Sequence, residues 1–162
     1  MSLATTVSTA LGVAKAAVLE SRVGELTLQA EAAAMPGLAD RISADLGGRL
    51  TALFASDERS WSGRFMVHHV WSLPKERTFL HVVASIDPVT PAFPSIAAKH
   101  PAANWFEREI MDFFGLVPEG HPNLSRVALH DDWPEGAWAL RKDFAADRWC
   151  PASPGNSIPS GR

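Results

Sequence analysis

Apolar and polar residues alternate in three stretches of the chain, residues 23–30, 64–73 and 78–86. This period of two predicts strands with one buried face. Two of the stretches, residues 64–73 and 78–86, are joined by a short turn at Pro74–Arg77. A connection this short predicts an antiparallel hairpin. We predict further strands at residues 23–30 and 49–56. The side chains expected on the buried faces are Leu26, Leu28, Ala30, Phe65, Val67, Trp71, Leu73, Leu80, Val82, Ala84 and Ile86.

Two other stretches repeat their apolar residues every three or four positions, which predicts helices with one apolar face. Pro36 opens the first helix and Gly47 ends it, since glycine accepts the left-handed conformation of a helix C-cap. The second helix lies in residues 100–116 and ends at Gly115. The repeating residues are Leu38, Ile42 and Leu46 in the first helix, and Phe106, Ile110, Phe113 and Phe114 in the second.

The order of elements predicts an α+β fold, with helices packed on one face of a small mixed β-sheet, followed by an irregular C-terminal arm. We expect the body at residues 1–116, an extended arm rich in proline, glycine and charge at 117–149, and a disordered tail at 150–162. Residues 1–22 are expected to form a short N-terminal helix or a flexible segment. The apolar side of that helix would hold Val7, Leu11 and Val18.

Composition narrows the class of protein. The chain has 162 residues and a net charge of −3, so nothing indicates a nucleic-acid-binding surface. The single cysteine, Cys150, excludes an internal disulfide and any four-cysteine iron–sulfur or zinc site within the chain. No apolar run is long enough to span a membrane. The first residues carry no basic side chain before their apolar part, so no secretory leader is expected.

The usual catalytic signatures are missing. The sequence has no phosphate-binding G-x-x-x-x-G-K-[ST] loop, no G-x-G-x-x-G turn, no G-x-S-x-G elbow and no H-E-x-x-H pair. We therefore expect no catalytic, cofactor-binding or metal-binding residue. The neighbours His68 and His69 should point to opposite faces of a strand, and His81 should contact one of them across the hairpin. The alternative is a stand-alone metal-dependent enzyme that uses His100, His121 and His130, with Asp131 and Asp132 nearby.

Charged residues cluster on the helix at 100–116. Glu109 and Asp112 are three apart and should lie on one side of that helix, together with Trp105. Arg141 and Lys142 come at the end of the arm, which has little apolar mass to hold it. Pairing between arginine and carboxylate could dock such an arm, or a partner. We therefore predict an arm that a partner protein orders, with Glu107, Glu109 and Asp112 fixing where it leaves the body.

Several motifs together resemble one family. They are W-F-E-R-E-I-M-D-F-F-G-L at 105–116, G-H-P-N-L-S-R at 120–126, W-P-E-G at 133–136 and L-R-K-D-F at 140–144. Their order is similar to that in the 30 kDa subunit family of complex I. This family includes the C subunit of the bacterial NADH–quinone oxidoreductase (NADH dehydrogenase) and the corresponding domain of group 4 nickel–iron hydrogenases and formate hydrogenlyase.

The resemblance implies an accessory subunit without a cofactor of its own. It would lie in the hydrophilic arm of a membrane-bound electron-transport complex, on the cytoplasmic side of the inner (plasma) membrane. Its partners would be the large subunit, of the 49 kDa or nickel–iron hydrogenase type, and a neighbouring iron–sulfur subunit; it would touch the membrane only through the complex. The partner-binding residues implied are Trp105, Glu107, Arg108, Glu109, Asp112, Gly120, His121, Pro122, Arg126, Trp133, Trp138, Arg141, Lys142 and Asp143.

The chain also departs from the family's pattern. Phe106 stands where a tyrosine is common, and Asn123 and Ser125 replace an acid and an arginine. The stretch H-D-D-W-P-E-G at 130–136 resembles the hydrogenase branch more than the respiratory branch. In some relatives the domain is fused to the large subunit, so the chain is either a free-standing subunit or part of a longer one.

Overall fold

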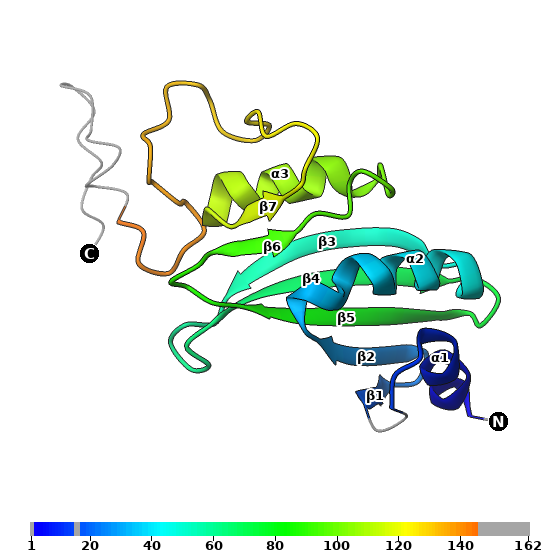
Figure 1. Cartoon of the computed structure of the whole chain (residues 1–162). Helices are drawn as coiled ribbons and strands as arrows, with labels where there is room; N and C mark the ends of the chain where they lie inside the picture. Colours follow the sequence, from blue (N-terminus) through cyan, green and yellow to red (C-terminus); the bar gives the residue numbers. More distant parts are fainter. Residues whose placement is uncertain (1, 15–16, 146–162) are drawn as a thin grey trace, which may run out of the picture.

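A five-stranded mixed sheet forms the centre of the fold in a computed structural model that describes residues 2–14 and 17–145 (Figure 1). The strands lie in the order β1-β2-β5-β4-β3. β2 and β5 run parallel, whereas the other neighbours are antiparallel, and the predicted hairpin of β4 and β5 is confirmed. The bounds are β1 Val18–Arg22, β2 Glu25–Ala30, β3 Arg49–Asp57, β4 Phe65–Leu73 and β5 Thr78–Ile86.

The helices are α1 (Leu3–Leu11), α2 (Met35–Leu46) and α3 (Ala103–Phe114), with a short 3₁₀ turn, η2 (Ala32–Ala34), before α2. A parallel pair, β6 (Ala92–Pro94) and β7 (Val117–Glu119), flanks α3 in the chain. Both predicted helices end where expected, because Gly47 and Gly115 take left-handed conformations with φ of 61° and 65°. Among the described residues, no helix is long and apolar enough to cross a membrane.

The hydrophobic core lies between the sheet and the helices. Figure 1 shows α1 and α2 on the near side of the sheet, and α3 packs against β3. The alternating pattern of β4 buries every second side chain, from Phe65 to Leu73, and the predicted face of β5 is buried likewise. Leu38, Ile42 and Leu46 of α2 are buried as predicted. The predicted α+β class, with helices on one face of a mixed sheet, is confirmed.

The N-terminal prediction was partly wrong. Val7 and Leu11 are buried on α1, but the helix stops at Gly12, whose φ is 64°. Val18 instead begins the edge strand β1, which pairs with β2. The spacing of Val7, Leu11 and Val18 fits a helix. A five-residue edge strand with a single buried apolar side chain leaves no period of two to recognise.

The predicted face of α3 also needs correction. Ile110 and Phe114 are buried, whereas Phe106 and Phe113 are only partly so. Two acids also face inward: Glu107 and Asp112 are 0% and 4% exposed. Asp112 therefore does not share an exposed side with Glu109. The arm is described as far as Ala145, so the predicted tail, including Cys150, lies outside the described residues.

Candidate docking surface

Helix α3 positions Glu107, whose buried carboxylate holds the segment that leads into the helix. One carboxylate oxygen accepts a hydrogen bond from Ser95 Oγ at 2.5 Å, and the other accepts one from the backbone N–H of Ile96 at 2.8 Å. Burial raises the pKa of Glu107, while these donors act in the opposite direction. Glu107 thus ties β6 and its continuation to α3.

His121 joins the start of the arm to the same helix. Its Nε2 donates to the carbonyl of Asn104 at 3.1 Å, and its Nδ1 accepts from the backbone N–H of Asn123 at 3.0 Å. The His121 Nε2 also lies 3.9 Å from Glu107. Both side chains are fully buried. The G-H-P-N turn is therefore fixed to α3 by hydrogen bonds within the chain.

Asp112 holds the middle of the arm. Its Oδ2 atom accepts from the backbone N–H groups of Val127 and Ala128, both at 2.9 Å, and from that of Leu129 at 3.4 Å. Successive backbone N–H groups that point at one oxygen form an anion-binding site, and here the anion is a carboxylate of the same chain. This arrangement satisfies the buried carboxylate and three backbone donors together.

Two arginines hold carbonyl groups of the arm. Arg108 donates to the carbonyls of Ser125 and Arg126, at 2.7 and 3.0 Å, and to Ser125 Oγ at 2.8 Å. Arg126 in turn donates to the carbonyls of His130 and Trp133 at 3.2 and 3.0 Å. The guanidinium group offers several donors in a fixed plane, which suits an irregular backbone without ladder partners.

The end of the arm is fastened to both α3 and the β3–β4 hairpin. Arg141 Nε donates to the carbonyl of Phe114 at 2.7 Å, and its guanidinium lies 5.0 Å from the Phe65 ring and 5.4 Å from the Trp138 ring. Trp138 packs so closely on Gly115 that a Cβ added there would lie 2.5 Å from the indole. Burial lowers the pKa of Arg141.

Asp57 and Arg59 complete this attachment, although no pattern in the sequence indicates their role. Asp57 Oδ2 accepts from the backbone N–H of Lys142 at 2.9 Å and from Arg59 at 2.7 Å. Hydrogen bonds from Arg59 are the main cause that lowers the pKa of Asp57. Arg59 also pairs with Asp143 at 2.8 Å. Both residues lie in a polar run that resembles an ordinary loop, and their partners in the arm are more than eighty positions away.

The predicted partner-binding residues divide into two sets. One set is buried or half-buried and binds other parts of this chain: Glu107, Arg108, Asp112, His121, Arg126, Trp133, Trp138 and Arg141. The other set is exposed, although Lys142 and Asp143 also contact Asp57 and Arg59: Trp105, Glu109, Gly120, Pro122, Lys142 and Asp143. Trp105 is 68% exposed and lies 5.7 Å from the Arg108 guanidinium. The first set builds a defined surface, and the second is exposed on it.

The histidines that the structure describes share no metal site. His69 is buried while His68 lies on the opposite face, where its Nδ1 is 3.0 Å from His81 Nε2, so the predicted cross-strand contact is present. His100 contacts Asp40 at 3.2 Å and Trp71 edge-on. His130 is exposed on the arm. Within residues 2–14 and 17–145, no group of three or more His, Cys, Asp or Glu side chains could hold a metal ion, so His100, His121 and His130 are not brought together as the alternative enzyme would require.

Comparison with known proteins assigns the family. The family described as "Respiratory-chain NADH dehydrogenase, 30 Kd subunit" matches residues 28–148. The chain belongs to this family. The match includes β3 to β5, α3 and the arm, and it confirms the resemblance found in the motifs.

Relatives come from two kinds of complex. The chain is 36% identical to formate hydrogenlyase subunit 5 of Escherichia coli (strain K12) over 129 residues, which cover 79% of this chain and 23% of that protein. It is 37% identical to hydrogenase-4 component G of the same organism, covering 74% and 22%. The C subunit of NADH-quinone oxidoreductase from Roseobacter denitrificans is 34% identical, covering 74% and 60%. The chain therefore spans about a quarter of the first two relatives.

Two solved structures share the fold. A trypsin-resistant fragment of Nqo5 superposes with a TM-score of 0.59 at 24% identity, covering 66% of this chain and 88% of that one. A chain of the membrane-bound sulfane sulfur reductase, an archaeal respiratory membrane complex, gives 0.69 at 18% identity, covering 90% and 89%.

Proposed function

We propose that the chain is a non-catalytic accessory subunit of a membrane-bound oxidoreductase and docks, through α3 and the arm, onto the cofactor-bearing large subunit of the hydrophilic arm. Its relatives are subunits of NADH–quinone oxidoreductase and of hydrogenase-type complexes. The E. coli relatives support the choice of partner, because the part of each that matches this chain is joined to a much longer remainder. We expect a polypeptide like that remainder to be the partner.

The proposal rests on the way in which α3 and the arm, residues 103–114 and 117–145, form one surface, here called the α3–arm surface. Buried Glu107 and Asp112 fix two irregular segments to α3, so their backbones have a defined shape without a regular secondary structure. On that support Trp105 remains 68% exposed, although tryptophan is among the residues that most often dominate binding energy at interfaces. A pre-organised surface loses less conformational entropy on binding than a flexible arm would.

Two further features favour one type of complex. The H-D-D-W-P-E-G stretch at 130–136 and the similarity to formate hydrogenlyase subunit 5 favour an energy-converting hydrogenase over the respiratory enzyme. The chain would be a peripheral subunit on the cytoplasmic side of the inner (plasma) membrane, attached through its partners. These would be the large subunit and a neighbouring iron–sulfur subunit, with no nucleic acid involved.

Co-purification from native membranes tests the proposal. The tagged chain should co-purify, in stoichiometric amount, with another polypeptide of the same organism. That polypeptide should be similar either to the remainder of formate hydrogenlyase subunit 5 or to the large subunit of the respiratory enzyme. Trp105→Ala should reduce the amount recovered. The matched control is Val89→Ala, because Val89 is 86% exposed and lies outside α3 and the arm. Recovery of the chain free of any oxidoreductase subunit would overturn the proposal.

A further inference from the structure

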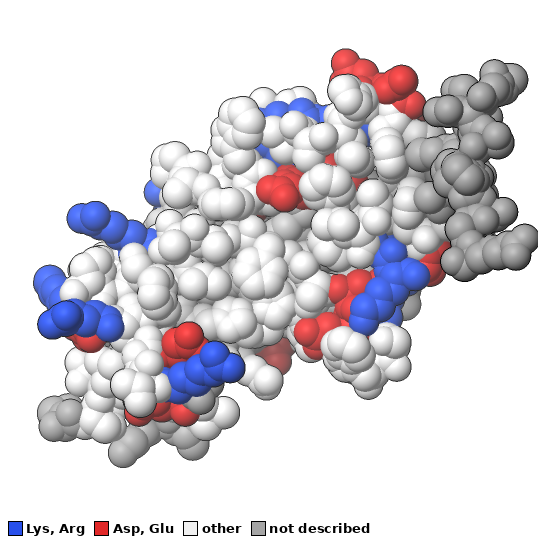
Figure 2. Space-filling view, turned by 180° about the vertical axis from the view of Figure 1, so that it is seen from behind, with Lys and Arg blue, Asp and Glu red and all other residues white. Residues whose placement is uncertain are grey.

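The sheet has a second face that no helix of the described residues covers. Figure 2 shows the molecule from behind Figure 1, and the face appears as a broad uncharged surface with its charged side chains mostly around the border. Glu25 and Arg49 stand at this border, each at the first residue of its strand. The central side chains of this open face are Thr27, Gln29, Phe54, Met66, His68, Val70, Phe79, His81, Val83 and Ser85.

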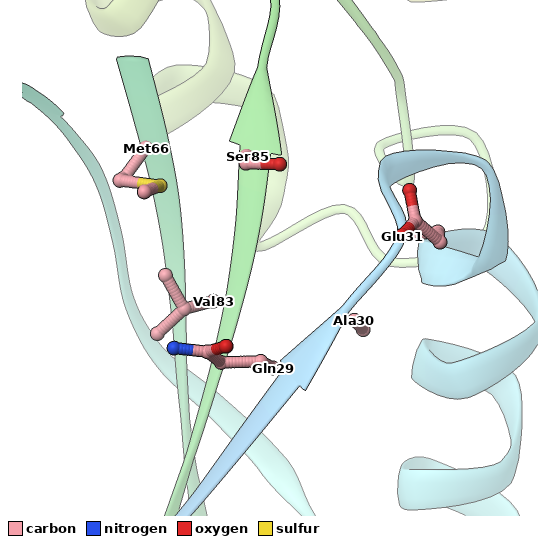
Figure 3. A pocket seen from close by; sticks show the side chains of 6 residues that line it. All are labelled: Gln29, Ala30, Glu31, Met66, Val83 and Ser85. Carbon is pink, nitrogen blue, oxygen red and sulfur yellow. The ribbon is translucent and has the colours of Figure 1, made fainter. Parts of the chain in front are cut away.

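Two shallow hollows mark the open face. One, of about 420 Å³, includes Thr27, Phe54, Phe79 and His81 in its lining, and both phenylalanines are nearly half exposed, at 46% and 47%. The other, of about 260 Å³, is shown in Figure 3, where Gln29, Val83 and Met66 come from three different strands. Exposed apolar area that is contiguous, rather than scattered, is characteristic of interaction sites.

Between the hollows lies a chain of contacts centred on His68. Its ring stacks on Phe54 at 4.7 Å between centroids, its Nε2 contacts Ser56 Oγ at 2.8 Å, and its Nδ1 contacts His81 Nε2 at 3.0 Å. Because a hydrogen bond between two imidazoles needs one donor and one acceptor, both rings cannot be fully protonated.

Both histidines of the pair are uncharged at neutral pH, because burial lowers their pKa values. Burial, and then the neighbouring His81, lowers the pKa of His68 to about 4, although Glu58 raises it. Burial also lowers the pKa of His81, against an opposing effect of Glu25. The centre of the open face is therefore uncharged in spite of its two histidines.

The size of the open face limits what can cover it. Three strands of nine residues and one of six, about 4.8 Å apart and rising about 3.3 Å per residue, give roughly 500 Å². A stable interface buries about 800 Å² on each partner. A second copy of the chain that used this face alone would therefore be held weakly. A partner that already contacts the chain elsewhere would not have this difficulty.

The open face is continuous with the α3–arm surface. Phe54 lines the larger hollow and also a groove of about 80 Å³ against α3, which it shares with Glu109, Phe113 and Leu140. Leu140 of the arm is 54% exposed at that groove. One partner can therefore extend from α3 across the edge of β3 onto the sheet.

We propose that the open face is a second docking surface for the same large subunit, which covers it with an uncharged apolar segment, and that contact requires the His68–His81 pair to remain unprotonated. The inference rests on the proposed function and adds to it a defined face and a chemical property of the partner. A charged group placed on the face would be buried against that segment without a counter-charge, which strongly disfavours binding.

Binding of the tagged variants to the purified large subunit tests the inference. Phe79→Glu should weaken binding about tenfold or more at pH 7.5, as loss of a central interface residue does. Gln29→Lys places a charge on the same face and should also weaken binding. Val89→Glu is the matched control and should leave affinity unchanged. Binding of the unaltered chain should weaken as pH falls toward 4, where His68 gains a proton, and less so for a His68→Gln, His81→Gln double variant.

The outcomes separate this inference from the proposed function. If Trp105→Ala weakens binding and neither Phe79→Glu nor Gln29→Lys does, the open face is not a docking surface, although the proposed function stands. If none of the three variants has an effect, both proposals are wrong. A concentration-dependent dimer of the free chain that Phe79→Glu dissociates, with binding to the large subunit unchanged, would show that a second copy covers the face. Melting temperatures confirm that each variant is folded.

Discussion

The body and the arm of this chain are stabilised in different ways. The body buries one connected cluster of apolar side chains between the sheet and its helices, and its neighbouring strands form hydrogen bonds between their backbones. The arm, from residue 117 to 145, has few buried apolar side chains, of which Ala137 is one. Its backbone groups instead bind Asp112, Arg108 and Asp57. A segment without regular structure can thus have a defined shape when buried or half-buried charged groups replace the missing ladder partners.

The largest expected effect concerns the body. Leu80 is fully buried in the central strand β5, so Leu80→Ala should lower the free energy of unfolding by about 2–5 kcal/mol and affect the whole chain. Chemical denaturation followed by circular dichroism measures it, with Val89→Ala as an exposed control. A loss below about 1 kcal/mol would show that the sheet does not dominate stability.

Removing a carboxylate from the arm's support should have a smaller and local effect. Asp112→Ala leaves the N–H groups of Val127 and Ala128 without their acceptor and should cost about 2–3 kcal/mol. Hydrogen exchange should quicken at residues 127–129 while the amides of β4 and β5 remain protected. Glu109→Ala, an exposed acid on the same helix, is the control. Equal loss of protection in the sheet would mean that the arm and body unfold as one unit.

Acid should destabilise the body through His69. Burial lowers the pKa of His69 to about 3 from its ordinary value of 6.5, so the unfolded chain binds a proton that the folded chain does not. The stability from this residue is therefore present above pH 6.5 and is lost as pH falls toward 3, by about 2 kcal/mol at pH 5. Denaturation at about pH 7.5 and about pH 5 measures the loss. His69→Leu should reduce the pH dependence, and an unchanged dependence would exclude His69 as its source.

The smallest effect on stability is expected at Trp105. Because its side chain is 68% exposed, Trp105→Ala should change the free energy of unfolding by less than about 0.5 kcal/mol. The same variant should impair recovery of the complex. A large loss of stability would place Trp105 among the supports of the arm, and the docking surface would then lie elsewhere.

Periodicity predicted most of the body correctly, since the buried face of a strand or helix repeats at short range. It could not reveal β1, which contributes a single buried apolar side chain. The burial of the two acids of α3 was still harder to predict from the sequence. Glu107 and Asp112 resemble a solvated charged face until their partners, Ser95 and Val127, come together from 12 and 15 residues away. The motifs identified the family, but only the structure shows that many of the predicted partner-binding residues support the arm from within.

Because many of these residues support the arm from within the chain, the expectation that a partner orders the arm changes. Its composition predicted a segment that a partner orders, yet Asp112, Arg108 and Arg141 already provide it with partners inside the chain. We therefore expect the amides of Val127 and Ala128 to exchange slowly even in the isolated chain. Fast exchange there, with protection only in the complex, would support the prediction made from composition.

Electron microscopy of the intact complex purified from native membranes tests the central claim most directly. We predict density for this chain against the large subunit, with Trp105 of α3 and the exposed edge of the arm buried in that contact. The same map shows whether the contact continues past Phe54 onto the open face of the sheet. A map in which α3 and the arm face solvent, and another surface of the chain meets the large subunit, would contradict the proposed docking.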